Sequence, residues 1–244
     1  MGLVDGSGRA DGSGRADRSG LAADVQLWLA SPAQGLSAAI ESVCGAEAGA
    51  EALARLAPSR LTVVATVSSD RACWAELVRH SDAGSETCLA GLTYDPSGRV
   101  GRLIWLRAPL VPPGTPVTGD PAPEAQPVLE AYFAALMTSR FEEAAAQFTA
   151  DTLYSHPPYA GGRERVLFRG RDALEHGFAT VRGPSPARQI VTALWQRGSR
   201  VFVEGVIEGI PDGGSFFSTA EISREGEIAR YVAFYSATRI PSAG

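Results

Sequence analysis

Lysine is absent from this 244-residue chain, so all 22 of its basic side chains are arginines. With 27 acidic residues the formal net charge is −5, which gives no reason to expect nucleic acid or an anionic membrane as a partner. No apolar run is long enough to span a bilayer, and the N-terminus lacks the hydrophobic stretch of a signal peptide. We therefore expect a cytoplasmic protein.

Cysteine and histidine are also scarce. Cys44, Cys73 and Cys88 stand far apart without CxxC spacing, and the chain contains only three histidines. No Cys/His cluster has the ligand spacing of a zinc site, so we expect no metal, and nothing indicates another cofactor. Buried structural thiols are the simplest interpretation of the cysteines. The hydrophobic content of 45% is that of an ordinary globular protein.

What the chain does contain is a repeat at a distance of 128 residues. Residues 58–108 align with residues 186–236 without a gap, at low identity but with the same pattern of strands and turns. The identical pairs include Pro58 and Pro186, Glu76 and Glu204, Gly98 and Gly226, and Arg102 and Arg230. A repeat of this length indicates two copies of one domain rather than a solenoid of short units.

Composition divides the chain into four parts. Residues 1–20 are rich in Gly and Ser, contain DGSGRA twice, and are expected to form a disordered tail. Residues 21–108 read as Ala- and Leu-rich helices followed by strands, which makes them the first domain. The proline-rich residues 109–126 predict a semi-rigid linker. Residues 127–244 then form the second domain.

Both domains are expected to contain four consecutive antiparallel strands. These are predicted near residues 60–68, 72–80, 86–94 and 100–107, and again near 188–197, 200–209, 215–223 and 228–236. In the second domain two helices, a strand with TLYSHPP, a short strand VLF and a third helix precede them. The predicted fold class is α+β, with two cone-shaped domains in which helices pack on a curved antiparallel sheet. Such a cone leaves a pocket between helices and sheet.

Three segments of the second domain carry a family resemblance. They are AYFAALMTSRFEEAAAQFTADTLYSHPP, FRGRDAL and GEIARYVAFY. Together, over residues 127–238, they resemble the nuclear transport factor 2-like superfamily, which includes ketosteroid isomerase, scytalone dehydratase, limonene epoxide hydrolase and the SnoaL-like polyketide cyclases. The superfamily pattern F-x-x-D-x-x-x-x-x-P is met by Phe148, Asp151 and Pro157. Because this fold hosts many activities, the resemblance implies the fold more specifically than the function.

The closest motif match, to ketosteroid isomerase, implies two catalytic residues. His156 falls at the position of that enzyme's general base, immediately before a proline. Tyr132 falls at the position of the helix tyrosine that donates a hydrogen bond to the developing oxyanion. The third functional position, a protonated acid, falls near Ser218 or Thr219, with Glu221 nearby. No acid stands at the matching place, so this sequence departs from the isomerase pattern there.

The residues themselves support part of this assignment. Tyr154 and His156 share one face of a strand. An imidazole, with a reference pKa of about 6.5, can act as a general base or acid near neutrality, and a nearby phenol can polarise a carbonyl. The alternatives are that His156 caps a strand end and that Tyr132 packs in the core. The residues expected to contact a substrate are Tyr154, Tyr159, Phe178, Trp195, Thr219, Glu221, Tyr231 and Tyr235.

The two copies are unequal. Val201 and Val203 belong to the apolar row of their strand, so Glu204 should lie on the outer face of the sheet, which is commonly a dimer interface in this superfamily. The first copy lacks the strand that carries Tyr154 and His156, and we therefore expect it to be degenerate. The two copies would then form the dimer internally, as a pseudo-dimer, and the chain would be a monomer.

Three functions are consistent with the sequence. The first is a cofactor-independent acid–base enzyme of the isomerase, dehydratase or cyclase type that acts on a small apolar molecule. The Gly-, Ala- and Arg-rich composition suggests a high-GC bacterium and secondary metabolism, such as polyketide chemistry. The second is a non-catalytic small-molecule-binding or scaffold protein of the same fold. The third is an epoxide-opening cyclase or hydrolase, although the paired acids of the tandem cyclases cannot be placed in this sequence.

Overall fold

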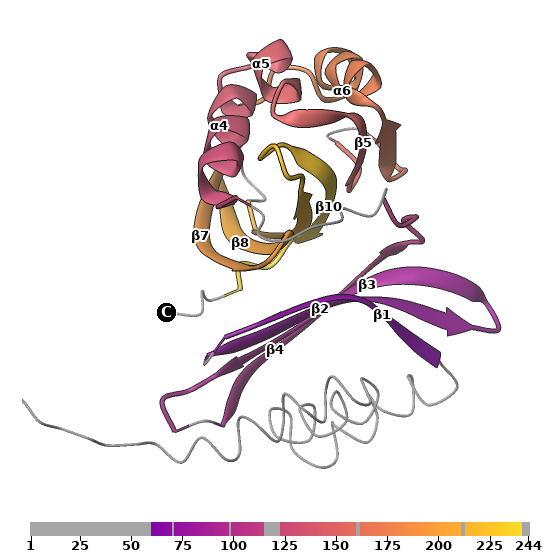
Figure 1. Cartoon of the computed structure of the whole chain (residues 1–244), viewed down its shortest axis with the longest axis vertical. Helices are drawn as coiled ribbons and strands as arrows, with labels where there is room; N and C mark the ends of the chain where they lie inside the picture. The colour runs from indigo at the N-terminus through magenta and orange to yellow at the C-terminus, as the bar shows by residue number, and fades with distance from the viewer. Residues whose placement is uncertain are drawn as a thin grey trace, which may run out of the picture.

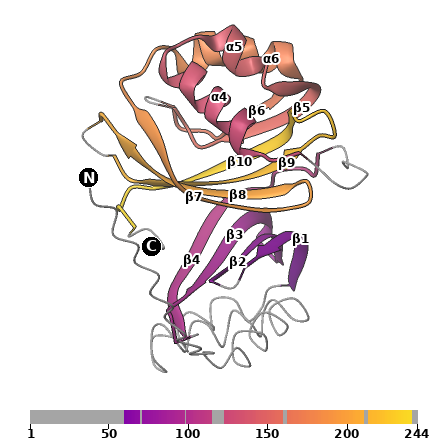
Figure 2. The ribbon, with the colours of Figure 1, turned by 60° about the vertical axis from the view of Figure 1, so that its left-hand side comes forward.

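The computed structural model describes residues 60–240, apart from positions 70, 98, 115–122, 160–161 and 211–212. The predicted tail at residues 1–20 and the predicted helices before residue 60 lie outside the described residues. Within the described range, the chain forms three layers, which Figure 2 shows in side view: a layer of helices, a six-stranded sheet and a four-stranded sheet. None of the described helices is long and apolar enough to cross a membrane.

The four-stranded sheet is an antiparallel meander. Its strands are β1 (Arg60–Ser68), β2 (Ala72–Ser81), β3 (Gly84–Tyr94) and β4 (Val100–Pro109), in that spatial order. Asp95 closes the turn between β3 and β4, where its Oδ1 accepts hydrogen bonds from the backbone N–H groups of Ser97 and Arg99 at 2.8 and 3.0 Å. The turn between β2 and β3 uses Gly84 at a φ of 120°. The predicted strands are confirmed to within two residues.

The second domain combines helices with a six-stranded sheet, and Figure 1 shows the helices on one side of that sheet. Its elements are α4 (Gln126–Met137), α5 (Phe141–Ala145), β5 (Phe148–His156), β6 (Val166–Arg169), α6 (Arg171–Gly177), a π-helical turn η1 (Phe178–Arg182), β7 (Arg188–Arg197), β8 (Arg200–Glu208), β9 (Ser215–Ile222) and β10 (Ile228–Ser236). The spatial order is β6-β5-β10-β9-β8-β7, and the pairing of β5 with β10 is parallel. The long meander and the preceding helices therefore follow the predicted order.

Helix α4 packs on the inner face of the six-stranded sheet. Leu129, Tyr132, Phe133 and Leu136 recur with helical spacing, and all four are buried. They meet Phe216 and other apolar residues of β8, β9 and β10 in one core cluster. Burial of this apolar stripe is what holds the helical layer to the sheet.

A second core lies between the two sheets. It joins Trp74, Leu89 and Ile104 of the four-stranded sheet to residues on the outer face of the six-stranded sheet, including Phe202 and Phe217. The Trp74 ring stacks on Phe202 at a centroid distance of 6.3 Å. The six-stranded sheet is therefore buried on both faces, by helices on one and by the other sheet on the second.

The four-stranded sheet and strands β7–β10 share one register at a shift of 128 residues. Arg60 pairs with His80, and Arg188 pairs with Glu208. The irregularities coincide as well, between Val63 and Ala65 in β1 and between Val191 and Ala193 in β7, then at Tyr94/Val100 and Ile222/Ile228. A bulge redirects every following side chain, so equal bulges keep equivalent residues on equivalent faces.

The predicted fold class needs one correction. The second domain is an α+β cone of helices and a six-stranded sheet. The part before it is, over its described residues, a four-stranded sheet without helices. Two complete cones are therefore not what the structure shows, because the helices expected for the first lie before residue 60. The linker predicted at residues 109–126 falls between β4 and α4, and it includes the undescribed residues 115–122.

Candidate functional site

The interior of the cone is filled with aromatic side chains. Tyr132 of α4, Tyr154 of β5 and Tyr231 of β10 are buried there, together with Phe148 and Phe178. Tyr154 stacks on Tyr231 at 5.4 Å, and Phe178 meets Tyr154 edge-on at the same distance. The structure thus brings together Tyr132, Tyr154, Phe178 and Tyr231, which the sequence predicts as site residues. Packed rings make this an apolar environment that strengthens the few polar contacts inside it.

Three phenol groups form a chain of hydrogen bonds through this interior. The Oη atoms of Tyr132 and Tyr154 are 3.1 Å apart, and Tyr154 Oη is again 3.1 Å from Tyr159 Oη. Tyr159, in the loop after β5, is half-buried, whereas the other two have almost no exposed surface. Burial raises the pKa of Tyr159 to about 12 and also raises the pKa values of Tyr132 and Tyr154. All three phenols are therefore protonated at neutral pH and can donate hydrogen bonds.

His156 ends strand β5 beside this chain. Its ring stacks on Tyr159 at a centroid distance of 4.4 Å and lies parallel to Tyr154 at 6.2 Å. His156 Nδ1 is 2.7 Å from the carbonyl oxygen of Pro157. A carbonyl only accepts, so Nδ1 carries the hydrogen and Nε2 of the neutral ring keeps a free electron pair. Burial lowers the pKa of His156 to about 4, against the opposing effect of the Pro157 bond, so the ring is neutral at pH 7.

Two further hydroxyls face the same interior. Ser218 pairs with Ala233 across β9 and β10, on the inner face of the sheet. Its Oγ and the Oη of Tyr231 are buried, and they interact with each other without forming a well-aligned hydrogen bond. Buried polar groups are rarely left in this state, so they are the natural partners of a polar group brought in by a ligand. Ser218 therefore occupies the inward-facing position near which the resemblance would place an acid.

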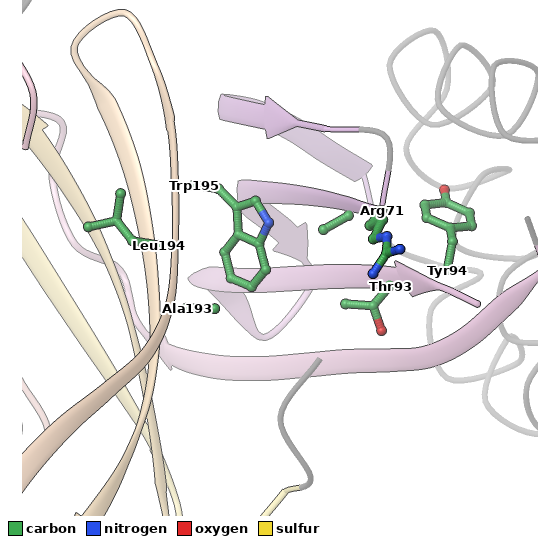
Figure 3. Close-up of a pocket in the computed structure, with 7 residues that line it drawn as sticks. Arg71, Thr93, Tyr94, Ala193, Leu194 and Trp195 are labelled. Atoms are coloured by element: carbon green, nitrogen blue, oxygen red, sulfur yellow. The ribbon is translucent and has the colours of Figure 1, made fainter. Parts of the chain in front are cut away.

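Trp195 is placed outside the cone. Figure 3 shows its indole extending towards the four-stranded sheet, while the neighbouring Leu194 points the opposite way. The indole packs on Trp74 at a centroid distance of 5.1 Å. It also lines a hollow of about 250 Å³ at the junction of the sheets, with Arg71, Ala72, Thr93, Tyr94, Ala193 and Leu194. Trp195 thus belongs to the contact between sheets and is removed from the predicted substrate pocket.

The same correction applies to Thr219 and Glu221. Both lie on the outer face of β9, because their side chains alternate with those of Ser218 and Ala220. Thr219 Oγ1 donates a hydrogen bond to Glu76 Oε2 of the other sheet at 2.7 Å. Glu221 accepts a hydrogen bond from Arg200 Nη1 at 2.7 Å.

Tyr235 lies near the end of β10 and is 37% exposed. It is therefore not part of the packed aromatic interior, although the sequence predicts it as a substrate contact.

The described residues offer no group of three or more His, Cys, Asp or Glu side chains that could hold a metal ion. Cys73 and Cys88 are buried free thiols, as expected, and Cys44 lies outside the described residues. Burial raises the pKa of each to about 12. Both are protonated at neutral pH, so neither is a reactive nucleophile. The chemistry that the interior offers comes from one imidazole and several hydroxyls.

This arrangement can be compared with known proteins. Residues 129–235 match the SnoaL-like domain family. The matched residues run from α4 to β10 and include His156 and the phenol chain, and we call them the SnoaL-like domain after this match. The four-stranded sheet lies outside the match. No curated protein matches the chain.

Several solved structures are similar to part of the chain. A candidate ketosteroid isomerase from Kribbella flavida is 21% identical, with 48% of this chain and 82% of that chain covered and a TM-score of 0.37. A candidate polyketide cyclase from Sinorhizobium meliloti is 16% identical, with coverages of 44% and 93% and a TM-score of 0.37. RV0760c from Mycobacterium tuberculosis, solved in complex with estradiol-17beta-hemisuccinate, is 12% identical, with coverages of 46% and 93% and a TM-score of 0.40. Likenesses of this degree carry no argument about activity.

Proposed function

We propose that the SnoaL-like domain performs cofactor-independent acid–base chemistry on a small, largely apolar molecule that carries a carbonyl group. The observation that supports this most directly is the pairing of a neutral imidazole, with Nε2 free, and the accessible end of a phenol chain. One group can accept a proton while the other stabilises the oxygen on which negative charge develops. Isomerases, dehydratases and cyclases all need this pair of functions, and polyketide-like molecules are substrates of suitable chemistry.

His156 is assigned as the general base. Its Nε2 takes a proton from the carbon next to the substrate carbonyl, and the electron pair moves onto the carbonyl oxygen as an enolate forms. The imidazolium then returns the proton to another carbon in an isomerisation, or to a departing hydroxyl in a dehydration. A pKa of about 4 makes the free imidazolium unfavourable. The enolate formed beside it offsets that cost, because opposite charges attract strongly in an apolar site.

Tyr159 is assigned as the group that donates to this oxygen. Tyr132, which the resemblance implies for this role, has no exposed surface and is bonded to Tyr154. If Tyr132 donates to Tyr154 and Tyr154 donates to Tyr159, the Tyr159 hydroxyl hydrogen is left for the substrate. Each bond in such a chain polarises the next. Tyr132 and Tyr154 are then positioning residues that act through Tyr159.

Two alternatives have different support. A non-catalytic binding protein is favoured by Ser218, an uncharged residue at the inward position where an acid would complete the isomerase pattern. An epoxide-opening enzyme would need paired carboxylates in the cone. The buried glutamates among the described residues are Glu76, Glu204 and Glu221, and all three belong to the outer side. The acid–base enzyme remains the proposal, with the binding protein as its competitor.

We also propose that the four-stranded sheet is a degenerate copy of the sheet of the SnoaL-like domain, so that the chain forms a pseudo-dimer internally. The shared register and bulges support this. So do the ion pairs between the sheets: Glu76 binds Arg230, and Glu204 binds Arg102. These residues are equivalent at the shift of 128, so the two pairs are reciprocal. Reciprocal contacts are the signature of an interface related by a twofold axis.

A panel of β,γ-unsaturated ketones tests the catalytic proposal, because migration of the double bond is followed by the ultraviolet absorbance of the conjugated product. His156→Ala should lower turnover roughly 10²–10⁴-fold, and Tyr159→Phe roughly 10²–10³-fold. Tyr132→Phe should lower turnover by a smaller factor, because it removes only the hydroxyl that is farthest from the substrate in the phenol chain. Tyr94→Phe is the matched control, since it removes a phenol hydroxyl of β3, outside the cone.

The pH dependence of kcat/KM provides a second readout. Activity should rise with pH through about 4 and then stay level, because the neutral imidazole is the active form. Full activity in both His156→Ala and Tyr159→Phe, on a ketone that the wild type converts, would overturn the assignment. Absence of turnover, with equal ligand binding by wild type and variants, would favour the binding protein.

A further inference from the structure

A second hollow, of about 260 Å³, opens where the two sheets meet beside the end of β5. It is lined by Arg107, Ala108 and Pro109 of β4, by Pro157, Pro158, Arg163 and Arg165 between β5 and β6, and by Phe234 and Tyr235 of β10. Three of these residues are arginines, and none is acidic. The walls between them are prolines and aromatic rings. The hollow thus combines cationic corners with apolar walls, although the net charge of the chain is −5.

Arg165 forms no direct ion pair with a carboxylate among the described residues, although Glu76 is near enough to favour its charged form. Its Nε donates a hydrogen bond to Ser155 Oγ at 2.7 Å, its Nη2 donates to the carbonyl oxygen of Ala233, and its guanidinium lies 5.4 Å from the ring centre of Phe234. All these partners are neutral, and Nη1 has no hydrogen-bond partner in the described part of the chain. Burial lowers the pKa of Arg165 to about 10, so the group stays charged at neutral pH.

Two carboxylates near the hollow, Glu86 and Glu76, are already bound by arginines, and the exposed Glu164 is not among the residues that line it. Glu86 is shared by two arginines, with Nε of Arg107 at 2.9 Å and Nε of Arg79 at 3.1 Å. Glu76 is bound by Arg230 and Thr219 in the buried contact between the sheets. Arg163 is exposed and forms no ion pair with a described residue. The hollow therefore has an excess of positive charge, with capacity for one more carboxylate.

We propose that this hollow binds the carboxylate of a small aromatic or apolar acid. Guanidinium groups suit that task, because their paired N–H donors match the two oxygens of a carboxylate. Pro109, Pro157 and Phe234 provide the surface for the apolar body of the acid. The site is separate from the cone interior, since Phe234 belongs to the core between the sheets. One of its lining residues, Pro157, directly follows His156 in the chain. The proposal for this hollow does not depend on whether His156 is catalytic.

The test compares 2-naphthoate with neutral 2-naphthamide, by calorimetry on the full-length protein. Naphthoate should bind at least about tenfold more tightly than the amide, which is roughly the value of one charge-assisted hydrogen bond. Arg163→Gln and Arg107→Gln should each weaken naphthoate binding about five- to tenfold, and added salt should weaken it further. Arg188→Gln is the matched control, because it removes an exposed arginine of β7 outside the hollow and should leave affinity within about twofold.

Three outcomes would overturn the proposal: no naphthoate binding at millimolar concentration, equal affinity for the amide, or an equal loss in Arg188→Gln. A fourth is naphthoate binding that is lost in Tyr159→Phe but unchanged in Arg163→Gln and Arg107→Gln. That result would place the acid in the cone and leave the proposed function standing. Conversely, arginine-dependent binding in a protein whose His156→Ala variant keeps full activity would overturn the proposed function alone.

Discussion

The four-stranded sheet and strands β7–β10 have the same register, yet only the second carries a candidate site. The difference begins at one edge. Strand β10 pairs with β5, which carries Tyr154 and His156, whereas its counterpart β4 is the last strand of its sheet within the described residues. The comparison teaches that the meander supplies a scaffold and an outer face. The chemistry comes from the strand added to its edge and the helix packed over it.

The outer faces, in contrast, are used alike. Each sheet places a glutamate and an arginine at equivalent positions, and each glutamate binds the arginine of the other sheet. The pairs differ in depth. Glu76 and Arg230 are 1% and 3% exposed, whereas Arg102, the partner of Glu204, is 15% exposed. The two equivalent ion pairs are therefore expected to contribute different amounts to the free energy of unfolding.

The largest expected effect on stability comes from removing the glutamate of the more deeply buried ion pair. Glu76→Ala leaves a buried guanidinium without its carboxylate and should lower the free energy of unfolding by about 3–5 kcal/mol. Glu204→Ala should lower the free energy of unfolding by less, because the partly exposed Arg102 can be solvated by water when its partner is removed. Urea denaturation of both variants measures the difference. The double variant Glu76→Leu/Arg230→Met should recover most of the loss, and equal losses in the two single variants would refute the ranking.

A smaller effect is expected from His156 as the pH falls. Its folded-state pKa of about 4 lies below the ordinary value of 6.5, so the unfolded chain takes up the proton first. Stability should therefore decrease as the pH falls from about 6.5 towards about 4, by up to about 3 kcal/mol. Unfolding of the wild type and of His156→Gln at several pH values isolates this contribution. Parallel pH profiles for the two proteins would show that His156 is not held neutral by the fold.

The two variants that each remove one buried phenol hydroxyl should differ in stability by about 1 kcal/mol. Tyr132→Phe removes a hydroxyl that is bonded to Tyr154, so stability should fall by about 1 kcal/mol. Tyr231→Phe removes a buried hydroxyl whose contact with Ser218 falls short of a well-aligned hydrogen bond, so stability should fall by less or not at all. Thermal unfolding of the two variants side by side provides the comparison. A larger loss in Tyr231→Phe would mean that its hydroxyl is bonded after all.

The molecular mass of the protein in solution should not change with its concentration. If the four-stranded sheet takes the place of a second subunit, the face that would pair is already covered. Light scattering at micromolar concentration should then report the monomer mass of 25.5 kDa. A stable species of twice that mass would contradict the internal pseudo-dimer.

The sequence predicts the strands well, for a physical reason. The period-2 alternation and turn sequences such as DPSG are local signals, and they place β1–β4 and β7–β10 within a few residues. The same alternation correctly places Glu204 on the outer face. The aromatic residues of the cone are also foreseeable, since the family resemblance identifies Tyr132 and strand alternation puts Tyr154 on the same face as His156.

The sequence prediction fails at residues where the local pattern does not determine the direction in which a side chain points. The bulge between Val191 and Ala193 shifts the alternation in β7, so Trp195 faces the other sheet. The family resemblance does not separate Ser218 from Thr219, and a one-residue difference moves a side chain to the opposite face of the strand. The sequence does name Tyr159 as a site residue, but its hydrogen bond to Tyr154 depends on an irregular loop after two prolines, which no periodicity encodes.

The central claim is that the SnoaL-like domain holds one neutral imidazole, in one tautomer, against its phenol chain. Nitrogen NMR of the ring atoms tests it without any substrate, because the chain has only three histidines and His→Gln variants assign them. The account predicts that His156 titrates near pH 4 and carries its hydrogen on Nδ1 above that pH. Titration near 6.5 with mixed tautomers would contradict it.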